Sequence, residues 1–243
     1  LIAGVNAALL VKGRPPFILG RADAYIGVLV DDLVTKGTNE PYRIMTSRAE
    51  YRLILRQDNA DLRLTEKGRQ LGLVSDERYR RFIAKRDAID RTLALLAATP
   101  VNPTAETQAK LRAMGSAELR TGSSLYDLLR RTEIDYAKLR QHFALPDVPP
   151  AVREQVEIAV KYEGYIRKQF EQVERAAKLE GKLLPVDLDY DQLSGLSQEA
   201  RQKLSQIRPL SVGQASRISG VSPADVSILL VSLEQRRRRG DEP

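Results

Sequence analysis

Arginine and tyrosine side chains recur through residues 42–63, and their types suit contacts with nucleic acid. A guanidinium can pair with a phosphate through two parallel hydrogen bonds, and tyrosines such as Tyr42 and Tyr51 can stack on unpaired bases. The arginines follow one another at intervals of four to seven residues, at Arg43, Arg48, Arg52, Arg56 and Arg63. The pattern therefore predicts an RNA-backbone surface.

The charge of the chain is concentrated around the same arginines. Between residues 43 and 86 there are twelve basic and six acidic residues, so this segment carries +6 of the formal +7 of the chain. Such a basic surface attracts the phosphate backbone. The alternative is a solvated face whose arginines pair with Glu50, Asp58 and Asp61. Composition alone favours the alternative, and both interpretations stay open.

The apolar run over residues 1–11 contains small residues that let a helix approach another backbone or a flat ligand closely. Its small residues are Ala3, Gly4, Ala7 and Ala8, and Asn6 adds a polar group. A packed core helix explains the same residues and is favoured on them alone. The run has no initiating Met and is not a signal peptide, so we expect a piece of a longer chain.

Catalytic chemistry has little support in the sequence. The chain has no cysteine, which excludes a disulfide framework, a thiolate metal site and a cysteine nucleophile within it. It shows no dinucleotide fingerprint, phosphate-binding loop or nucleophile–base pair. Adjacent Asp31 and Asp32 would point about 100° apart on a helix, so we expect a surface or capping role. His142 suits a helix C-terminus. We predict no catalytic or metal-binding residue.

The elements that position these residues are mainly α-helices. Capping signals and apolar periodicity predict helices at about 76–98, 105–114, 124–131, 133–142, 151–179 and 197–207. Residues 51–56 alternate loosely and predict a strand in a first segment that mixes helices with a few strands. No apolar run reaches 18 of the 243 residues, so we expect no membrane span and a cytoplasmic protein.

The chain closes with a predicted helical hairpin over residues 211–234. Ser211 and Ser222 suit the two N-caps, and Gly220 suits the turn. A DNA-reading hairpin needs polar base-reading residues at the start of its second helix, but Asp225 would repel phosphate there. The arginines at 236–239 are the one feature that favours DNA. We therefore expect a protein-docking hairpin.

Several stretches together resemble one family, the tRNA uridine 5-carboxymethylaminomethyl modification enzymes (MnmG or GidA). They run from the first residue to about Glu234. The matching stretches are IAGVNAA at 2–8, LGR at 19–21, AYIGVLVDDLVTKG at 24–37, EPYR at 40–43, TSRAEYRL at 46–53, DNADLRLT at 58–65, QVEI at 155–158, KYEGYI at 161–166, IRP at 207–209 and GQASRISGV at 213–221.

The resemblance implies a C-terminal fragment of an FAD flavoprotein. Such enzymes act with the GTPase MnmE to modify the wobble uridine of tRNA, use NADH as reductant and a methylene-folate as one-carbon donor, and form homodimers. Their FAD fingerprint and cysteines would precede residue 1, which puts catalysis by this chain alone in doubt. The implied fold is the tail of an α/β FAD-binding domain followed by an all-helical domain ending in a helical hairpin.

The resemblance also assigns residues and segments. Residues 1–72 would be the tail of the FAD-binding domain, with Gly4 and Asn6 beside FAD and the five arginines facing tRNA. Residues 73–148 would form a helical segment, and residues 149–243 a helical domain for partner and tRNA binding. The residues that would contact MnmE are Arg217, Val226, Leu230 and Leu233.

Two rivals from other classes stay open at this point. One is a non-enzymatic helical protein that binds nucleic acid through the terminal hairpin and arginine tail. The other is a partner-docking module that contacts no nucleic acid. Salt-sensitive binding to tRNA, compared with binding to duplex DNA, distinguishes these two rivals from the tRNA-modification fragment.

Overall fold

A computed structural model describes residues 1–38 and 40–239, apart from the side chain of residue 239. The chain divides into two compact units. The first unit comprises residues 1–8 and 55–167, and the second comprises residues 9–54 and 168–243. The mainly α fold class is confirmed, whereas the FAD-binding tail stays a prediction.

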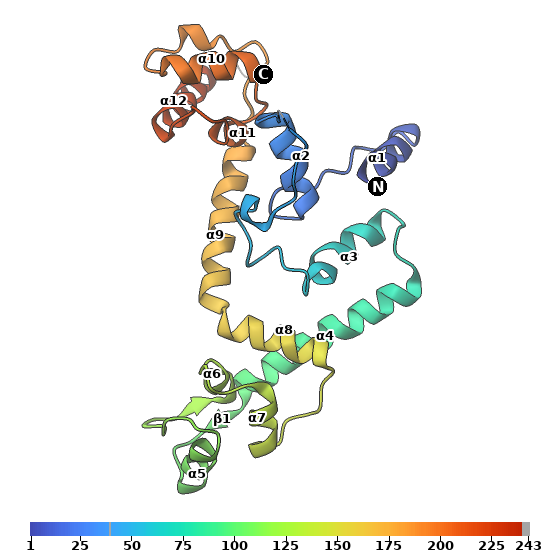
Figure 1. Cartoon of the computed structure of the whole chain (residues 1–243), viewed down its shortest axis with the longest axis vertical. Helices are drawn as coiled ribbons and strands as arrows, with labels where there is room; N and C mark the ends of the chain where they lie inside the picture. Colours follow the sequence, from blue (N-terminus) through green and yellow to red (C-terminus); the bar gives the residue numbers. More distant parts are fainter. Residues whose placement is uncertain (39, 240–243) are drawn as a thin grey trace. The chain divides into compact units, whose positions relative to one another are not determined.

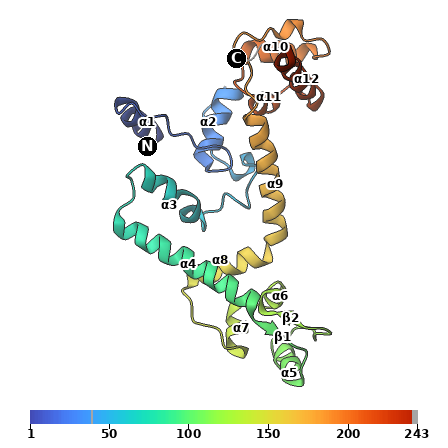
Figure 2. The same ribbon diagram turned by 180° about the vertical axis from the view of Figure 1, so that it is seen from behind.

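The first unit is built on two helices that pack together, α4 (Asp76–Ala98) and α8 (Pro150–Lys161). Figures 1 and 2 both show α8 crossing α4, and the two helices are in contact. The other helices of this unit are α3 (Ala60–Gln70), α5 (Ala105–Ala113), α6 (Leu125–Leu129) and α7 (Tyr136–His142). A two-residue antiparallel ladder joins β1 (Pro100–Val101) to β2 (Ser123–Ser124).

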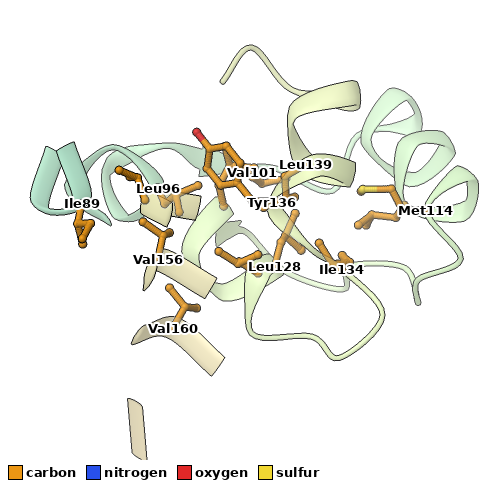
Figure 3. Packing of buried hydrophobic residues seen from close by; sticks show 14 residues of the cluster. Ile89, Leu96, Val101, Met114, Leu128, Ile134, Tyr136, Leu139, Val156 and Val160 are labelled. Carbon is orange, nitrogen blue, oxygen red and sulfur yellow. The ribbon is translucent and has the colours of Figure 1, made fainter. Parts of the chain in front are cut away.

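One hydrophobic core holds the first unit together. Figure 3 shows Leu96 of α4 beside Val156 of α8, with side chains from α6 and α7 completing the cluster. Leu96, Leu128 and Val156 are fully buried. Burial of a leucine or valine side chain contributes about 1.5–3 kcal/mol, so this core can fix the short helices that have little stability alone.

The second unit contains the terminal helices α10 (Gln198–Ile207), α11 (Val212–Ser216) and α12 (Pro223–Arg239), together with α2 (Tyr25–Thr35). It also contains short 3₁₀ turns at Thr46–Arg48 and Tyr190–Gln192. Its core includes Leu204, Val212 and Leu229, all fully buried. Two helices run through both units, α1 (Ile2–Val11) and α9 (Glu163–Glu180).

The predicted caps are present where the sequence places them. Ser75 accepts a hydrogen bond from the Arg78 amide, and Ser197 accepts one from the Ala200 amide. In the terminal hairpin, Ser222 and Asp225 cap α12 reciprocally, and Gly220 has a φ of +92°. Asp225 is buried in that cap, and its predicted repulsion of phosphate stays a prediction.

Two predicted elements are wrong. Residues 51–56 form a turn instead of a strand, because adjacent Ile54 and Leu55 are both buried and the Leu53 amide is bound by a side chain. No described residue among 1–72 lies in a strand. The single helix at 151–179 is two helices, separated at Tyr162, whose φ of −104° and ψ of 8° leave the helical region. Gly164 weakens helix propensity directly after the break.

None of the helices formed by the described residues combines the length and the apolar character needed to cross a bilayer.

Candidate nucleic-acid interface

Three of the five predicted RNA-contacting arginines lie on one loop of the second unit, residues 40–54, which we call the basic loop. Arg43, Arg48 and Arg52 are exposed, and among the described residues none of them pairs with a carboxylate. The guanidinium of Arg48 lies over the ring of Tyr42, 4.4 Å from its centroid. These side chains can therefore offer positive charge to a phosphate without first breaking an ion pair.

The other two arginines have intramolecular roles in the first unit. The Arg56 Nε lies 3.1 Å from an Asp58 carboxylate oxygen. Arg63 donates to the Asn59 side chain over 3.0 Å and to the Arg56 carbonyl over 3.1 Å. Both side chains are half-buried. Binding a phosphate would compete with these contacts, so tRNA contact by Arg56 and Arg63 stays a prediction with less support than for the loop arginines.

Of the three acids expected to pair with these arginines, Asp58 is the one that does so among the described residues. Asp58 pairs with Arg56, whereas Glu50 pairs with Arg21 and Asp61 pairs with Lys85. Burial alone would raise the pKa of Asp58, but hydrogen bonds from Gln155 and Arg56 lower it. The alternative of a fully neutralised face therefore does not describe the 40–54 loop.

The loop is attached to α9 by one glutamine. Gln169 accepts a hydrogen bond from the Leu53 amide over 3.1 Å and donates one to the Glu50 carbonyl over 3.2 Å. Ala49 and Ile54 point into the unit and are 3% and 6% exposed. The basic side chains thus project from a backbone that is fixed at its C-terminal end.

Arg21 and α2 hold the other side of the loop. Gly27 allows the start of α2 to pack against residues 19 and 20, since an added Cβ would lie 2.2 Å from the Gly20 carbonyl oxygen. This approach brings the Arg21 guanidinium within 2.8 Å of both Asp31 and Asp32. The same guanidinium donates to Glu50 over 2.9 Å. Arg21 therefore connects α2 to the basic loop.

Asp32 is the most buried acid of this network, with 3% of its surface exposed. It accepts hydrogen bonds from Tyr42 (2.7 Å), Arg21 (2.8 Å) and Lys36 (3.0 Å). Burial favours the neutral acid, but these donors outweigh it and lower the pKa of Asp32 to about 2. Burial and the bond to Asp32 raise the pKa of Tyr42.

This low pKa predicts a loss of stability in acid. Above pH 4 the charged Asp32 stabilises the fold, and this contribution of about 2 kcal/mol disappears as the pH falls towards 2. Urea unfolding at pH 6 and pH 2.5 should therefore show a larger loss for the wild-type chain than for Asp32→Asn. An identical loss in both would contradict the assignment.

A second arginine extends the network to α11. The Arg217 Nε and Nη2 each lie 2.8 Å from a carboxylate oxygen of Asp31, and Nη1 contacts Glu180 of α9. Burial alone would lower the pKa of Arg217, but these acids raise it. The surface or capping roles predicted for Asp31 and Asp32 are wrong, because both side chains are acceptors in an internal ion-pair network.

A cavity of about 670 Å³ adjoins the network within the second unit. Arg21, Asp31, Glu180 and Arg217 line it, together with apolar side chains that include Val30 and Val173. Both arginines are already paired with carboxylates. Arg21 and Arg217 are therefore not available for phosphate contacts in the way that the exposed arginines of the basic loop are.

The predicted FAD neighbours lie on α1. Gly4 is exposed, and a Cβ added there would meet no atom within 4 Å among the described residues. Asn6 is half-buried and has an interaction partner. Contact of Gly4 and Asn6 with FAD therefore stays a prediction.

The predicted partner-binding residues belong to the second unit. Val226, Leu230 and Leu233 of α12 are half-buried and pack against the second core. Arg217 is 17% exposed at its side chain because of its ion pairs. Their contact with MnmE stays a prediction.

His142 is the last residue of α7, as expected for its structural role.

Family models and sequence relatives of this chain all belong to one protein family. Residues 76–170 match the model of the MnmG/GidA C-terminal helical domain, and residues 172–242 match that of the C-terminal helical bundle. The chain is 58% identical over 239 residues to the tRNA uridine 5-carboxymethylaminomethyl modification enzyme MnmG of Caldicellulosiruptor saccharolyticus, and 58% identical over 238 residues to that of Geobacillus thermodenitrificans. Each alignment covers 98% of this chain and 38% of the relative.

A solved structure agrees with the sequence relatives. Aquifex aeolicus GidA, in its form II crystal, matches with a TM-score of 0.76 and 41% identity. The match covers 95% of this chain and 36% of that protein. The chain therefore belongs to the MnmG/GidA family and corresponds to its C-terminal part.

Proposed function

We propose that this chain is the tRNA-binding and partner-binding part of an FAD-dependent tRNA-modifying enzyme. With the GTPase MnmE, the whole enzyme would add the carboxymethylaminomethyl group at C5 of the wobble uridine. The proposal includes NADH as reductant, a homodimeric enzyme and a cytoplasmic location. It is supported by relatives named tRNA uridine 5-carboxymethylaminomethyl modification enzymes, of which this chain spans 38%.

The exposed arginines of the 40–54 loop carry the proposal for this part. Arg43, Arg48 and Arg52 present positive charge that no described carboxylate neutralises. Each phosphate contact releases condensed counterions, so such a loop favours binding to an RNA backbone without reading its sequence. In this account the chain holds and orients tRNA, and the redox chemistry belongs to FAD bound by the whole enzyme.

The helices α10, α11 and α12 are the proposed MnmE-contacting part. They form one helical cluster around the second core. The tail arginines are less available than a DNA-binding tail requires, since Arg236 pairs with Asp187 and Arg238 with Glu234. This pairing gives the DNA-binding alternative no support.

Binding at matched salt tests the proposed function. The purified chain should bind tRNA more tightly than a DNA duplex of equal length at about 0.1 M salt, and the tRNA affinity should fall as salt rises. Fluorescence anisotropy with labelled tRNA and labelled duplex measures both affinities. A preference for the duplex would favour the DNA-binding alternative, and no binding to either would favour a module that docks partners only.

A further inference from the structure

The basic loop has too little secondary structure to fix its own arginines. Over residues 40–54 it contains one 3₁₀ turn, in which the Arg48 amide donates to Met45 over 3.1 Å and the Ala49 amide donates to Thr46 over 3.2 Å. One further turn bond joins the Ile54 amide to Tyr51. The conformation of residues 42–50 must therefore depend on side-chain contacts with other elements.

The Arg21 guanidinium contacts both the backbone of this loop and one of the loop's side chains. Its Nη2 lies 3.4 Å from the carbonyl oxygen of Arg48, and its Nε lies 2.9 Å from Glu50. Its Nη1 is fixed at 2.8 Å from Asp32 of α2. With 9% of its side chain exposed and three carboxylates around it, Arg21 has no donor to spare for a phosphate.

Asp32 is connected to Arg48 of the basic loop through the side chain of Tyr42. Its Oδ2 accepts the Tyr42 hydroxyl over 2.7 Å, and the Tyr42 ring carries the Arg48 guanidinium on its face at 4.4 Å. An exposed cation–π contact is weak, so it can hold Arg48 only if the ring itself is fixed. The bond to Asp32 fixes that ring.

We propose that Arg21 and Asp32 are positioning residues for tRNA binding, which act on Arg48 through the loop backbone and Tyr42 without touching RNA. The inference rests on the proposed function. Neither residue is suited to contact RNA directly, since Asp32 is a buried anion and Arg21 is enclosed by acids. Their contribution is to order the loop before binding, so that tRNA does not bear that entropic cost.

Tyr42→Phe tests the inference with the smallest change. It removes the hydroxyl bond to Asp32 but keeps the ring under Arg48, so every loop arginine is retained. We expect the tRNA affinity to fall about five- to tenfold, with the plot of log affinity against log salt shifted down but parallel. Arg48→Ala should instead lower the slope by about one, because it removes a phosphate contact.

Asp32→Asn gives a second, stronger variant, and Tyr165→Phe, at an exposed tyrosine, is the matched control. Hydrogen exchange at the Arg48 and Ala49 amides should speed up in both network variants and stay unchanged in the control. If Tyr42→Phe keeps the wild-type tRNA affinity and the wild-type hydrogen exchange, the inference is overturned but the proposed function is not. Absence of tRNA binding by the wild-type chain would overturn the proposed function, and the inference with it.

Discussion

Arg217→Ala is expected to lower the free energy of unfolding of the second unit by about 2 to 3 kcal/mol. The substitution removes a two-pronged ion pair with Asp31 and a contact with Glu180, and the side chains of Arg217 and Asp31 are mostly buried. Glu180 cannot easily turn away, because it also accepts from Ser211 and packs closely against Gly213. Urea unfolding followed by circular dichroism measures the loss.

The same variant separates a structural role for Arg217 from a partner-binding role. The control is Arg238→Ala, which breaks an exposed pair with Glu234 and should change stability by less than about 0.5 kcal/mol. If Arg217→Ala unfolds at the wild-type urea concentration yet no longer co-elutes with MnmE, then Arg217 contacts the partner and the account of its role in the fold is wrong.

Replacing Arg43, Arg48 and Arg52 with alanine together is expected to weaken tRNA binding about 100-fold at about 0.1 M salt. The reason is the loss of three charge-assisted contacts to phosphate from side chains that no described carboxylate holds back. Stability should change little, because all three side chains are exposed. Arg56 is left in place, since its pair with Asp58 would confound binding with folding.

A second triple variant controls for net charge. Arg112, Arg120 and Arg140 are exposed arginines of the first unit, and their replacement with alanine removes the same three charges. Charges that touch no phosphate are screened by salt, so if the loop arginines make the contacts, tRNA affinity should fall by less than about threefold at about 0.1 M salt. Equal losses in the two triple variants would mean that net charge, and not the loop, determines binding.

The helices were largely predictable, because their signals are local. Ser75 and Ser197 cap the helices that the apolar spacing predicts, and Gly220 takes the left-handed conformation that its place in the turn suggests. The break at Tyr162 has no clear signal in the sequence, because apolar residues continue through it at helical spacing and only Gly164 weakens the pattern.

The ion-pair network could not be predicted from spacing. Arg217 and Asp31 are 186 positions apart, and Arg21 and Glu50 are 29 apart, so only the fold brings them together. The sequence shows that Asp31 and Asp32 are adjacent but not that they are buried, because acids are seldom buried without partners and their partners are distant in sequence. The basic segment can be located from the sequence, and its contact with tRNA stays a prediction. The division between three exposed arginines and two engaged ones depends on the contacts with Asp58 and Asn59, which only the structure shows.

The most direct test of the account is the salt dependence of tRNA binding by the wild-type chain and the loop variant that lacks Arg43, Arg48 and Arg52. Affinities measured by anisotropy between 50 and 200 mM salt give the slope of log affinity against log salt. The slope should fall by about three, because three phosphate contacts are lost. An unchanged slope in the loop variant would contradict it.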